Sequence, residues 1–443
     1  MFVLKLLQAH RESLLAQRRS RAALEALQRR KFRALVAHCA RHSAYYRDII
    51  AERRIDPARC EVEDFPVLDK AAVVANFDRL LTLPGMTQQR LASFLEGADD
   101  PGALLDGRHT VIKSSGTTGQ IGFFILSEAD LARGMAPALQ INPYRGRRRK
   151  MAFYGLTTGH RAGVCMAATA RRGLMRLTYD VMTADVLQPV PETLAAIDRY
   201  QPDVLMAYPS GLLTLAEAQA RGEIDIRPQF IQCSGEILQP QNRQVIERAF
   251  GRPVANVYSS AEHMIMGMSP NGSTDMLLYE HNFIFEIADD HVLVTNLYNR
   301  TLPFIRYRHN DRLIPAEMPA GDSRPYRRVR EIIGRSDGGD VTFRSPSGRQ
   351  ASISSFALNY FYPKHAARWQ FRVSQQACRL DLMLEPGASA AASRIAVEDS
   401  LARLQAMFRE RELSNIQISA RVVEGIVPDP VTGKVRALVR EGV

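Results

Sequence analysis

Short apolar runs of β type alternate with stretches of helical pattern between about Val111 and Leu297. Strands separated by helices are typical of a parallel sheet, because each helix carries the chain back to the start of the next strand. The sequence therefore predicts an α/β body around a largely parallel sheet. The β-type runs are Thr110–Lys113, Met151–Tyr154, Asp203–Ala207, Gln229–Gln232 and Pro253–Tyr258, and a hairpin is expected from Phe283–Ile287 and Val292–Leu297.

Length and composition predict a globular protein of more than one domain. The chain has 443 residues, of which 46% are apolar and 24% charged, so it can bury a sizeable core and is neither disordered nor fibrous. At roughly 100–200 residues per domain, about two to four units are expected. The 58 lysines and arginines exceed the 47 acids by 11, a surplus that favours anionic partners such as nucleotides, nucleic acid or acidic membrane without choosing among them.

The five cysteines are scattered, with no Cys-x-x-Cys pair and no histidine at ligand spacing beside them. Neither a disulfide framework nor a zinc site is therefore expected. No apolar stretch approaches the roughly 18 residues of a membrane-spanning helix, and the first residues turn polar too soon for a secretory signal. We expect a cytoplasmic protein that is neither exported nor embedded in a membrane.

The segment from Arg11 to Leu35 combines leucine and alanine with many arginines and has no glycine or proline, which predicts one or two basic amphipathic helices. A solvated helix face is favoured there over a membrane or RNA patch, because such patches normally carry denser charge or interleaved aromatic residues. Another helix is expected after Pro209, with Ser210 as its N-cap and Gly222 just past its end.

The segment Lys113-Ser-Ser-Gly-Thr-Thr-Gly119 directly follows an apolar strand-like run. Its small residues let the backbone approach a phosphate, and its hydroxyls and amides can donate hydrogen bonds to the phosphate oxygens. The spacing does not match a Walker loop, and a tight turn without a ligand is the competing interpretation.

Acids follow two further strand-like runs, in Cys233-Ser-Gly-Glu236 and Tyr258-Ser-Ser-Ala-Glu262. Ligands of an open α/β sheet bind outside the carboxyl ends of its strands, so both segments are expected to face one crevice with the Ser/Thr loop. A carboxylate there can hold Mg²⁺ beside phosphate oxygens. Acids that cap helix N-termini give the same pattern and are the competing interpretation.

The run Leu302-Pro-Phe-Ile-Arg-Tyr-Arg-His-Asn-Asp311 predicts a strand that ends in an acid, and Ile332-Ile-Gly-Arg-Ser-Asp337 follows it. An aspartate at a strand end can accept both ribose hydroxyls, and an arginine adds charge near the sugar and phosphate, whereas structural ion pairing is the alternative. Gly334–Gly338 also fits a hydrolase nucleophile elbow, but turn and strand residues follow where that elbow needs a helix, so Ser336 is not expected to be a nucleophile.

Near the C-terminus, Val427-Pro-Asp-Pro-Val-Thr-Gly-Lys434 predicts a turn with one lysine at its tip. An ammonium group delivered to an active site can neutralise charge that builds on a phosphoryl group. A solvated loop lysine is the alternative for this segment in isolation.

The order of these motifs resembles the adenylate-forming superfamily, and within it the phenylacetate-coenzyme A ligase-like branch. The resemblance runs from Cys39-Ala-Arg-His-Ser-Ala-Tyr-Tyr-Arg-Asp48 through Tyr154-Gly-Leu-Thr-Thr-Gly159 and Tyr208-Pro-Ser-Gly211 to Lys434. It implies a large N-terminal domain over residues 1–335 that binds ATP and the acid, with a helical segment at 1–60. A small, mobile α+β C-terminal domain over residues 336–443 would carry the catalytic lysine.

The resemblance also implies roles for individual residues. The phosphate loop Ser114, Ser115, Gly116, Thr117, Thr118 and Gly119 would cradle the triphosphate, and Ser234, Gly235, Glu236 and Tyr258 would line the adenine pocket, with Ser259 also binding the nucleotide. Glu262 would bind Mg²⁺, and Asp311 would hold the ribose with support from Arg335. Asp337 would occupy the hinge, and Lys434 would stabilise the adenylation transition state.

In the reaction that this implies, a carboxylate attacks the α-phosphorus of ATP, pyrophosphate leaves, and the acyl-adenylate is shielded from water until an acceptor such as coenzyme A displaces AMP. An aromatic or otherwise planar acid is expected near Tyr154, Tyr208, His263 and Met264. His263 either contacts the carboxylate or is a polar residue on a helix after Glu262. A homodimer is suggested by analogy alone, and no nucleic-acid partner is expected.

Two departures from the family pattern leave alternatives open. Gln120-Ile121 stands where relatives usually carry lysine and proline, so the phosphate loop lacks a cation and a nucleotide-binding, non-catalytic homologue is one alternative. The segment after Asp337 does not match the glycine-containing loop of the thioester step, so transfer to an amine or to a carrier-protein thiol is the other.

Overall fold

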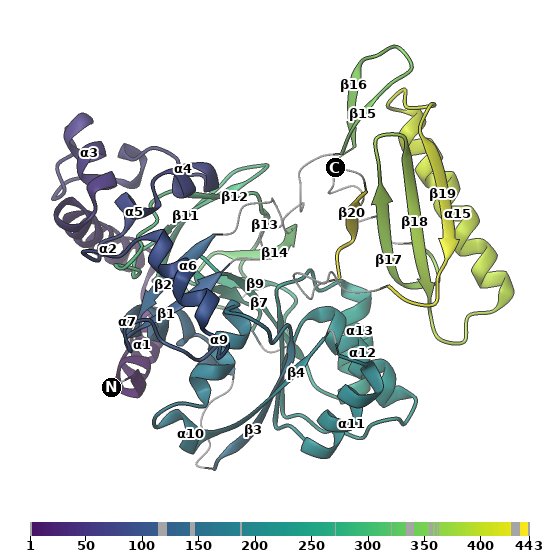
Figure 1. The fold of residues 1–443 in the computed structure, drawn as a ribbon, viewed down its shortest axis with the longest axis horizontal. Coiled ribbons are helices and arrows are strands. Elements are labelled where there is room, and N and C mark those ends of the chain that lie inside the picture. The colour runs from purple at the N-terminus through teal and green to yellow at the C-terminus, as the bar shows by residue number, and fades with distance from the viewer. Residues whose placement is uncertain are drawn as a thin grey trace. The chain divides into compact units, whose positions relative to one another are not determined.

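The computed structural model describes residues 2–113, 122–141, 147–186, 188–270, 272–319, 321–333, 341–353, 358, 361, 363–426 and 435–441. They form two compact units, the first made of the described residues up to 333 and the second of those from 341 to 441 (Figure 1). The domain boundary expected at residue 335 lies outside the described residues.

A mixed sheet, with nine strands among the described residues, runs through the first unit (Figure 1). One half consists of parallel strands, in the spatial order β4 (Tyr179–Asp185), β3 (Arg149–Gly155), β5 (Val204–Ala207), β6 (Phe230–Ser234) and β7 (Val254–Ser260). The other half is antiparallel and continues through β8 (Met264–Met268), β9 (Met276–Leu278), β14 (Arg328–Ile333) and β13 (Arg312–Ala316).

The predicted α/β body is confirmed, but the sheet is parallel over only half of its width. After β7 the chain reverses within the turn at residues 261–263 and returns as β8. A turn this short joins only antiparallel strands, since a parallel connection needs a crossover of a dozen or more residues. The second half of the sheet is therefore antiparallel.

Helices cover both faces of the parallel half. α11 (Val190–Tyr200), α12 (Pro209–Ala220) and α13 (Pro240–Phe250) lie on one side and α9 (Ala162–Ala170) on the other (Figure 1). Alternation along β3 explains this, because successive side chains of a strand point to opposite faces. Tyr154 belongs to the core with α12 and α13, whereas Phe153 packs against α9.

The helix predicted after Pro209 is confirmed as α12, but Ser210 is not its N-cap. Tyr208 occupies the N-cap position and Pro209 the first turn, where a missing amide hydrogen costs nothing. The Ser210 side chain instead donates a hydrogen bond to the carboxylate of Glu236. Gly222 lies just past the helix end with φ of +73°, as predicted.

Two smaller antiparallel sheets complete the strands of this unit, as far as it is described. β1 (His109–Lys113) pairs with β2 (Phe123–Ser127). The predicted hairpin is confirmed as β10 (Phe283–Ile287) and β11 (Val292–Asn296), which β12 (Tyr307–His309) extends to a third strand.

The basic N-terminal segment forms helices, as predicted. α1 (Phe2–Ala16) packs on α7 (Glu128–Met135), and α2 (Arg21–His42) begins at Ser20, whose side chain accepts a hydrogen bond from the amide of Ala23. The other helical segments of the unit are α3 (Ala44–Glu52), η1 (Val62–Asp64), α4 (Lys70–Ala75), α5 (Phe77–Leu80), α6 (Gln88–Gly97), α8 (Ala138–Ile141) and α10 (Met175–Thr178).

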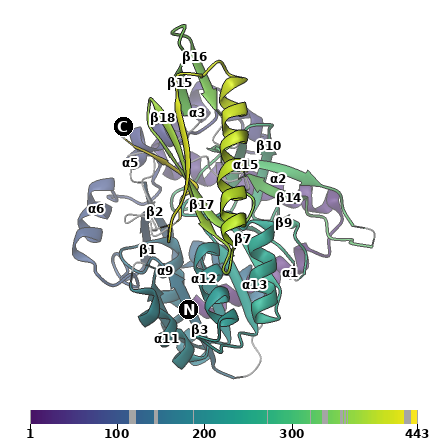
Figure 2. The ribbon, with the colours of Figure 1, turned by 90° about the vertical axis from the view of Figure 1, so that its right-hand side faces the viewer.

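The second unit is a sheet with one long helix along it, together with a separate hairpin. Its described strands follow the order β19 (Gln417–Val422), β18 (Ala377–Leu384), β17 (Ala366–Val373) and β20 (Leu438–Arg440). α15 (Ala390–Arg409) lies beside this sheet (Figure 2), and apolar residues from every second strand position pack with its Leu404 and Phe408. This confirms the α+β character predicted for the C-terminal part.

The hairpin of the second unit pairs β15 (Val341–Arg344) with β16 (Gln350–Ile353). β15 confirms that a strand follows the Gly334–Gly338 segment, so the pattern there is not a nucleophile elbow.

All five cysteines are free and buried. Burial raises the pKa of the Cys165 and Cys233 thiols to about 12 each, so both stay protonated at neutral pH. Within the described part of the chain, no helix combines the length and the hydropathy needed to cross a membrane.

Gly134 in α7 lies so close to β8 that a side chain does not fit. A Cβ at this position would lie 2.7 Å from the Met264 Cβ and 2.9 Å from the Tyr298 hydroxyl. We expect Gly134→Ala to lower the free energy of unfolding in urea by about 1–3 kcal/mol, because overpacking shifts the backbone. Gly97→Ala is the matched control, since nothing lies within 4 Å of a Cβ at the end of α6. Equal stability of the two variants would contradict the tight contact.

Asp381 in β18 is a buried acid whose side chain is 6% exposed. It accepts hydrogen bonds from the Nε atoms of Arg372 at 3.0 Å and Arg421 at 2.6 Å, and the Nε of Arg379 lies 3.3 Å away. Burial alone would raise the pKa of Asp381, but these guanidinium groups outweigh it and the net pKa is lowered.

This lowered pKa predicts a pH dependence of stability. The stabilisation is complete above about pH 4, where the unfolded acid ionises, and is lost as pH falls through the folded pKa. We expect the unfolding free energy to fall more steeply with acidification in the wild type than in Asp381→Asn, measured by urea denaturation at several pH values. Glu410→Gln removes a 75%-exposed acid of the same unit and should keep the wild-type slope. Identical slopes for wild type and Asp381→Asn would contradict the assignment.

Candidate functional site

The carboxyl ends of the parallel strands bring several predicted site residues to one edge of the sheet. Tyr154 precedes the last residue of β3, Tyr208 follows β5, Ser234 ends β6 and Ser259 lies near the end of β7. Because these strands are parallel and adjacent, their ends lie side by side. The amide of Tyr208 donates to the Tyr154 carbonyl at 3.3 Å, which links two of these strand ends directly.

Glu236 is held against the start of α12. Its carboxylate accepts hydrogen bonds from the Ser210 amide at 2.9 Å and the Ser210 hydroxyl at 3.0 Å. Gly235 before it has φ of +87°, a left-handed conformation that suits glycine and turns the chain sharply after β6. In the described chain Glu236 thus caps a helix N-terminus, which was the alternative to a direct ligand contact. Its role beside adenine stays a prediction.

Tyr258 and Asp311 meet across the first unit although they lie far apart in sequence. The Tyr258 hydroxyl donates to Asp311 Oδ2 at 2.7 Å, and both side chains are buried. Tyr258 comes from β7, and Asp311 lies between β12 and β13. The structure therefore joins the two segments for which the family resemblance implies adenine and ribose binding.

Glu262 lies in the turn between β7 and β8 and is 4% exposed. The Tyr307 hydroxyl donates to its Oε1 at 3.4 Å. Mg²⁺ is usually held by one or two carboxylates together with substrate phosphates, so a single glutamate at a strand end fits such a site. Among the described residues, no group of three or more His, Cys, Asp or Glu could hold a metal by itself.

His263 is fully buried, and no helix follows Glu262. Its ring lies 5.1–6.0 Å, centroid to centroid, from four other rings: Phe283, Phe304, Tyr307 and His309. Its carbonyl accepts a hydrogen bond from the Tyr298 hydroxyl at 2.7 Å. The alternative that placed His263 as a polar residue on a helix after Glu262 is wrong, because β8 begins at the next residue.

Met264 begins β8 with φ of +59°, which is unusual for a residue with a side chain. It is 1% exposed and packs against Gly134 of α7. Contacts of His263 and Met264 with an acid substrate stay predictions.

Tyr154 and Tyr208 lie near each other at the sheet edge. The Tyr154 ring packs on Gly211, where a Cβ would lie 3.0 Å from the ring. Tyr208 is half-buried, and burial raises the pKa of its hydroxyl to about 12, so the hydroxyl stays protonated at neutral pH. Tyr208 can therefore offer apolar surface and a hydrogen-bond donor, whereas the Tyr154 side chain is buried in the core.

Several predicted residues lie outside the described chain. These are the phosphate loop Ser114–Gly119 with Gln120, and Arg335, Asp337 and Lys434. The residues flanking the loop are described: Lys113 of β1 pairs with Phe123 of β2, and the Lys113 amide donates to the His160 carbonyl at 2.8 Å.

Three contributors to this region were not predicted. His309 has its Nδ1 3.9 Å from Asp311 Oδ2 and its ring beside His263. Tyr307 contacts Glu262, and Ser210 binds Glu236. His309 could have been found from the sequence, because it stands two residues before Asp311 and side chains two apart on a strand share a face. The other two contacts join distant segments and carry no local signal.

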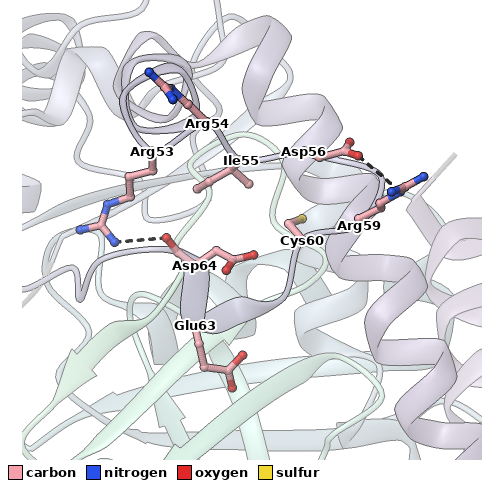
Figure 3. Close-up of a pocket in the computed structure, with 8 residues that line it drawn as sticks. All are labelled: Arg53, Arg54, Ile55, Asp56, Arg59, Cys60, Glu63 and Asp64. Carbon is pink, nitrogen blue, oxygen red and sulfur yellow. Dashed lines mark hydrogen bonds and ion pairs between the residues drawn. The ribbon is translucent and has the colours of Figure 1, made fainter.

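A surface pocket of about 610 Å³ lies between the end of α3 and η1 (Figure 3). Arg53 donates to the Asp64 carbonyl at 3.2 Å, and Arg59 lies 3.7 Å from Asp56. Arg54 and Glu63 point in different directions, so the charged groups do not converge on one point (Figure 3). No predicted site residue lines this pocket, and we assign it no function.

Comparison with known proteins relates the chain to acid-activating ligases. No family model matches the chain. The phenylacetate-coenzyme A ligase of Pseudomonas putida is 29% identical over 252 residues, 51% of this chain and 54% of that protein, so the chain spans about half the length of this relative. Protein CapK of Staphylococcus aureus is 21% identical over 70% of the chain and 68% of that protein. Indoleacetate–lysine synthetase of Pseudomonas savastanoi is 26% identical over 30% of the chain and 34% of that protein.

The fold is shared with a ligase of known structure. The crystal structure of 2-hydroxyisobutyryl-CoA ligase in the postadenylation state, in complex with R3-HIB-AMP, matches 96% of this chain and 91% of that chain with a TM-score of 0.69 at 18% identity. The sequence likeness to phenylacetate-coenzyme A ligases confirms the resemblance to the phenylacetate-coenzyme A ligase-like branch of the adenylate-forming superfamily, and the structure match shows that the fold is shared.

Proposed function

We propose that the protein activates a carboxylic acid with ATP, forming an acyl-adenylate and pyrophosphate, and then transfers the acyl group to coenzyme A. The observation that carries this proposal is the buried hydrogen bond between Tyr258 and Asp311, because it joins the two segments expected to hold adenosine. The fold shared with a ligase crystallised with an acyl-adenylate supports it.

In the first half-reaction, Asp311 accepts hydrogen bonds from the ribose hydroxyls, and the Tyr258 hydroxyl fixes the orientation of its carboxylate. The substrate carboxylate oxygen attacks the α-phosphorus of ATP, the bond to the bridging oxygen breaks, and pyrophosphate leaves. Glu262 would hold Mg²⁺, which neutralises phosphate charge when bound. Ser114–Gly119 bind the leaving phosphates, and Lys434 contributes positive charge in the transition state.

For the second half-reaction, we propose that Asp337 acts as a hinge and Arg335 supports the ribose while the C-terminal domain changes position. The thiol of the acceptor attacks the acyl carbon and AMP leaves. Coenzyme A is the acceptor named for the Pseudomonas putida relative. The five unpaired thiols suit a reducing compartment, so a cytoplasmic location is part of this proposal.

An aromatic acid is the proposed substrate. Tyr208 is half-buried at the sheet edge, where its amide binds the Tyr154 carbonyl, and an aromatic ring packs well on such a side chain. The relative named phenylacetate-coenzyme A ligase supports this substrate class. Any contact of Tyr154, His263 or Met264 with the acid would require backbone contact or movement, because these side chains are buried.

An amine acceptor is the second candidate, favoured by the likeness to indoleacetate–lysine synthetase. A carrier-protein thiol and a non-catalytic nucleotide-binding role are the remaining alternatives, and a homodimer is proposed by analogy alone.

The test is ATP–pyrophosphate exchange with a panel of aromatic and aliphatic acids, followed by mass spectrometry of products formed with coenzyme A, lysine or a carrier protein. Exchange with an aromatic acid and an acyl-coenzyme A product are expected. Exchange with only an amide product would establish the amine alternative. ATP binding without exchange for any acid would overturn the ligase proposal.

A further inference from the structure

The first helix presents a second apolar face that no other part of the described chain covers. Leu4, Leu7, Leu14 and Leu15 are 71%, 52%, 43% and 50% exposed. At about 100° per residue, they fall with Arg11 on one stripe of α1. The opposite stripe is buried and packs on α7; it consists of Leu6, Ala9, Ser13 and Ala16.

The exposed stripe carries one arginine, and two more follow in the turn after the helix. Arg11 lies among the leucines, and Arg18 and Arg19 come after Gln17. All three are exposed, and none of their side chains forms an ion pair or hydrogen bond with the described residues. Glu12 is the one acid of α1; it is half-buried and is engaged by Gln8 at 3.2 Å and Arg133 at 3.8 Å. The face therefore combines leucine surface with uncompensated positive charge.

We propose that this face of α1 binds the surface of an anionic phospholipid bilayer. The leucines would enter the boundary between headgroups and acyl chains, and the arginines would extend to the lipid phosphates. α1 has 15 residues with Arg11 inside the leucine stripe, so it would lie in the plane of the interface. The proposal is independent of the ligase activity proposed above.

The combination of leucines and arginines on this face argues against two other binding partners, a second copy of the chain and RNA. A second copy of the chain, docked face to face, would bring Arg11, Arg18 and Arg19 of both copies into one interface without acids to pair them. RNA would satisfy the arginines but would leave the four leucines in water. A bilayer with anionic headgroups satisfies both kinds of side chain.

Vesicle flotation of the full chain tests the proposal without any activity assay. The probes are vesicles of phosphatidylcholine mixed with phosphatidylglycerol and vesicles of phosphatidylcholine alone. We expect binding to the mixed vesicles that is at least about 10-fold tighter than to neutral ones, and that weakens as salt is raised.

Two sets of substitutions separate the apolar and the charged contributions. Replacing Leu4, Leu7, Leu14 and Leu15 with glutamine keeps helix propensity and should weaken binding about 100-fold or more. Replacing Arg11, Arg18 and Arg19 with glutamine should abolish the preference for anionic vesicles. Leu174→Gln with Leu177→Gln is the matched control, because these leucines are 62% and 63% exposed and also lie beside arginines. The control should bind as the wild type does.

Circular dichroism and thermal unfolding verify that each variant is folded. Absence of wild-type binding to the anionic vesicles, unchanged binding of the folded leucine variant, or an equal loss in the control would each overturn the proposal. A wild-type dimer that the leucine substitutions dissociate would assign the face to a second copy of the chain instead.

Discussion

Asp311→Asn should lower kcat/KM for ATP in pyrophosphate exchange by about 10- to 100-fold, mainly through a higher KM. Asparagine keeps the shape of the side chain but removes its charge, and hydrogen bonds to charged groups are worth about 1.5–3 kcal/mol. The proposed contact is with the ribose, which does not react, so it is made equally before and during the reaction and its loss should affect binding more than turnover.

Tyr258→Phe distinguishes the contribution of the tyrosine donor from that of the aspartate charge in the buried hydrogen bond. It removes the donor that lies 2.7 Å from Asp311 but leaves the carboxylate charged, so a smaller change of about 3- to 10-fold is expected. Asp290→Asn is the matched control, because Asp290 is a 74%-exposed acid at the turn between β10 and β11. The result that would contradict the ribose assignment is a folded Asp311→Asn variant with wild-type KM for ATP.

The sequence could predict those parts of the fold that local patterns determine. The strands β3, β5, β6 and β7 and the β10–β11 hairpin follow from apolar runs and their flanking residues, which act over a few positions. The direction of the second half of the sheet could not be predicted, because it depends on the tight turn at residues 261–263. A turn of this kind and the start of a helix look alike in the sequence, which is why a helix was expected after Glu262.

Contacts between distant segments could not be predicted from local sequence patterns. Ser210 fits an N-cap locally, but Pro209 takes the first helical turn and Ser210 binds Glu236, 26 residues away. Tyr258 and Asp311 lie 53 residues apart, and only the sheet brings them together. The motifs could therefore suggest which residues take part in the site, whereas their pairing depends on the fold.

Lys434→Ala should lower the rate of adenylation by about 10²-fold or more while leaving ATP binding nearly unchanged. The proposed role of the amine is to stabilise charge that develops at the α-phosphorus as the carboxylate attacks, so its contribution arises in the transition state. Isothermal calorimetry would measure ATP binding, and pyrophosphate exchange would measure the chemical step.

A second comparison distinguishes this role from a structural one. Acyl transfer from a preformed acyl-adenylate to coenzyme A involves no charge at a pentavalent phosphorus, so Lys434→Ala should leave this half-reaction close to the wild-type rate. Lys364→Ala is the matched control, since Lys364 is a 61%-exposed lysine of the same unit that pairs with Asp399 at 2.6 Å. It should change neither half-reaction. If Lys434→Ala slowed both half-reactions equally, or slowed neither, the lysine would have no specific part in adenylation, because transition-state stabilisation of one step cannot act on both.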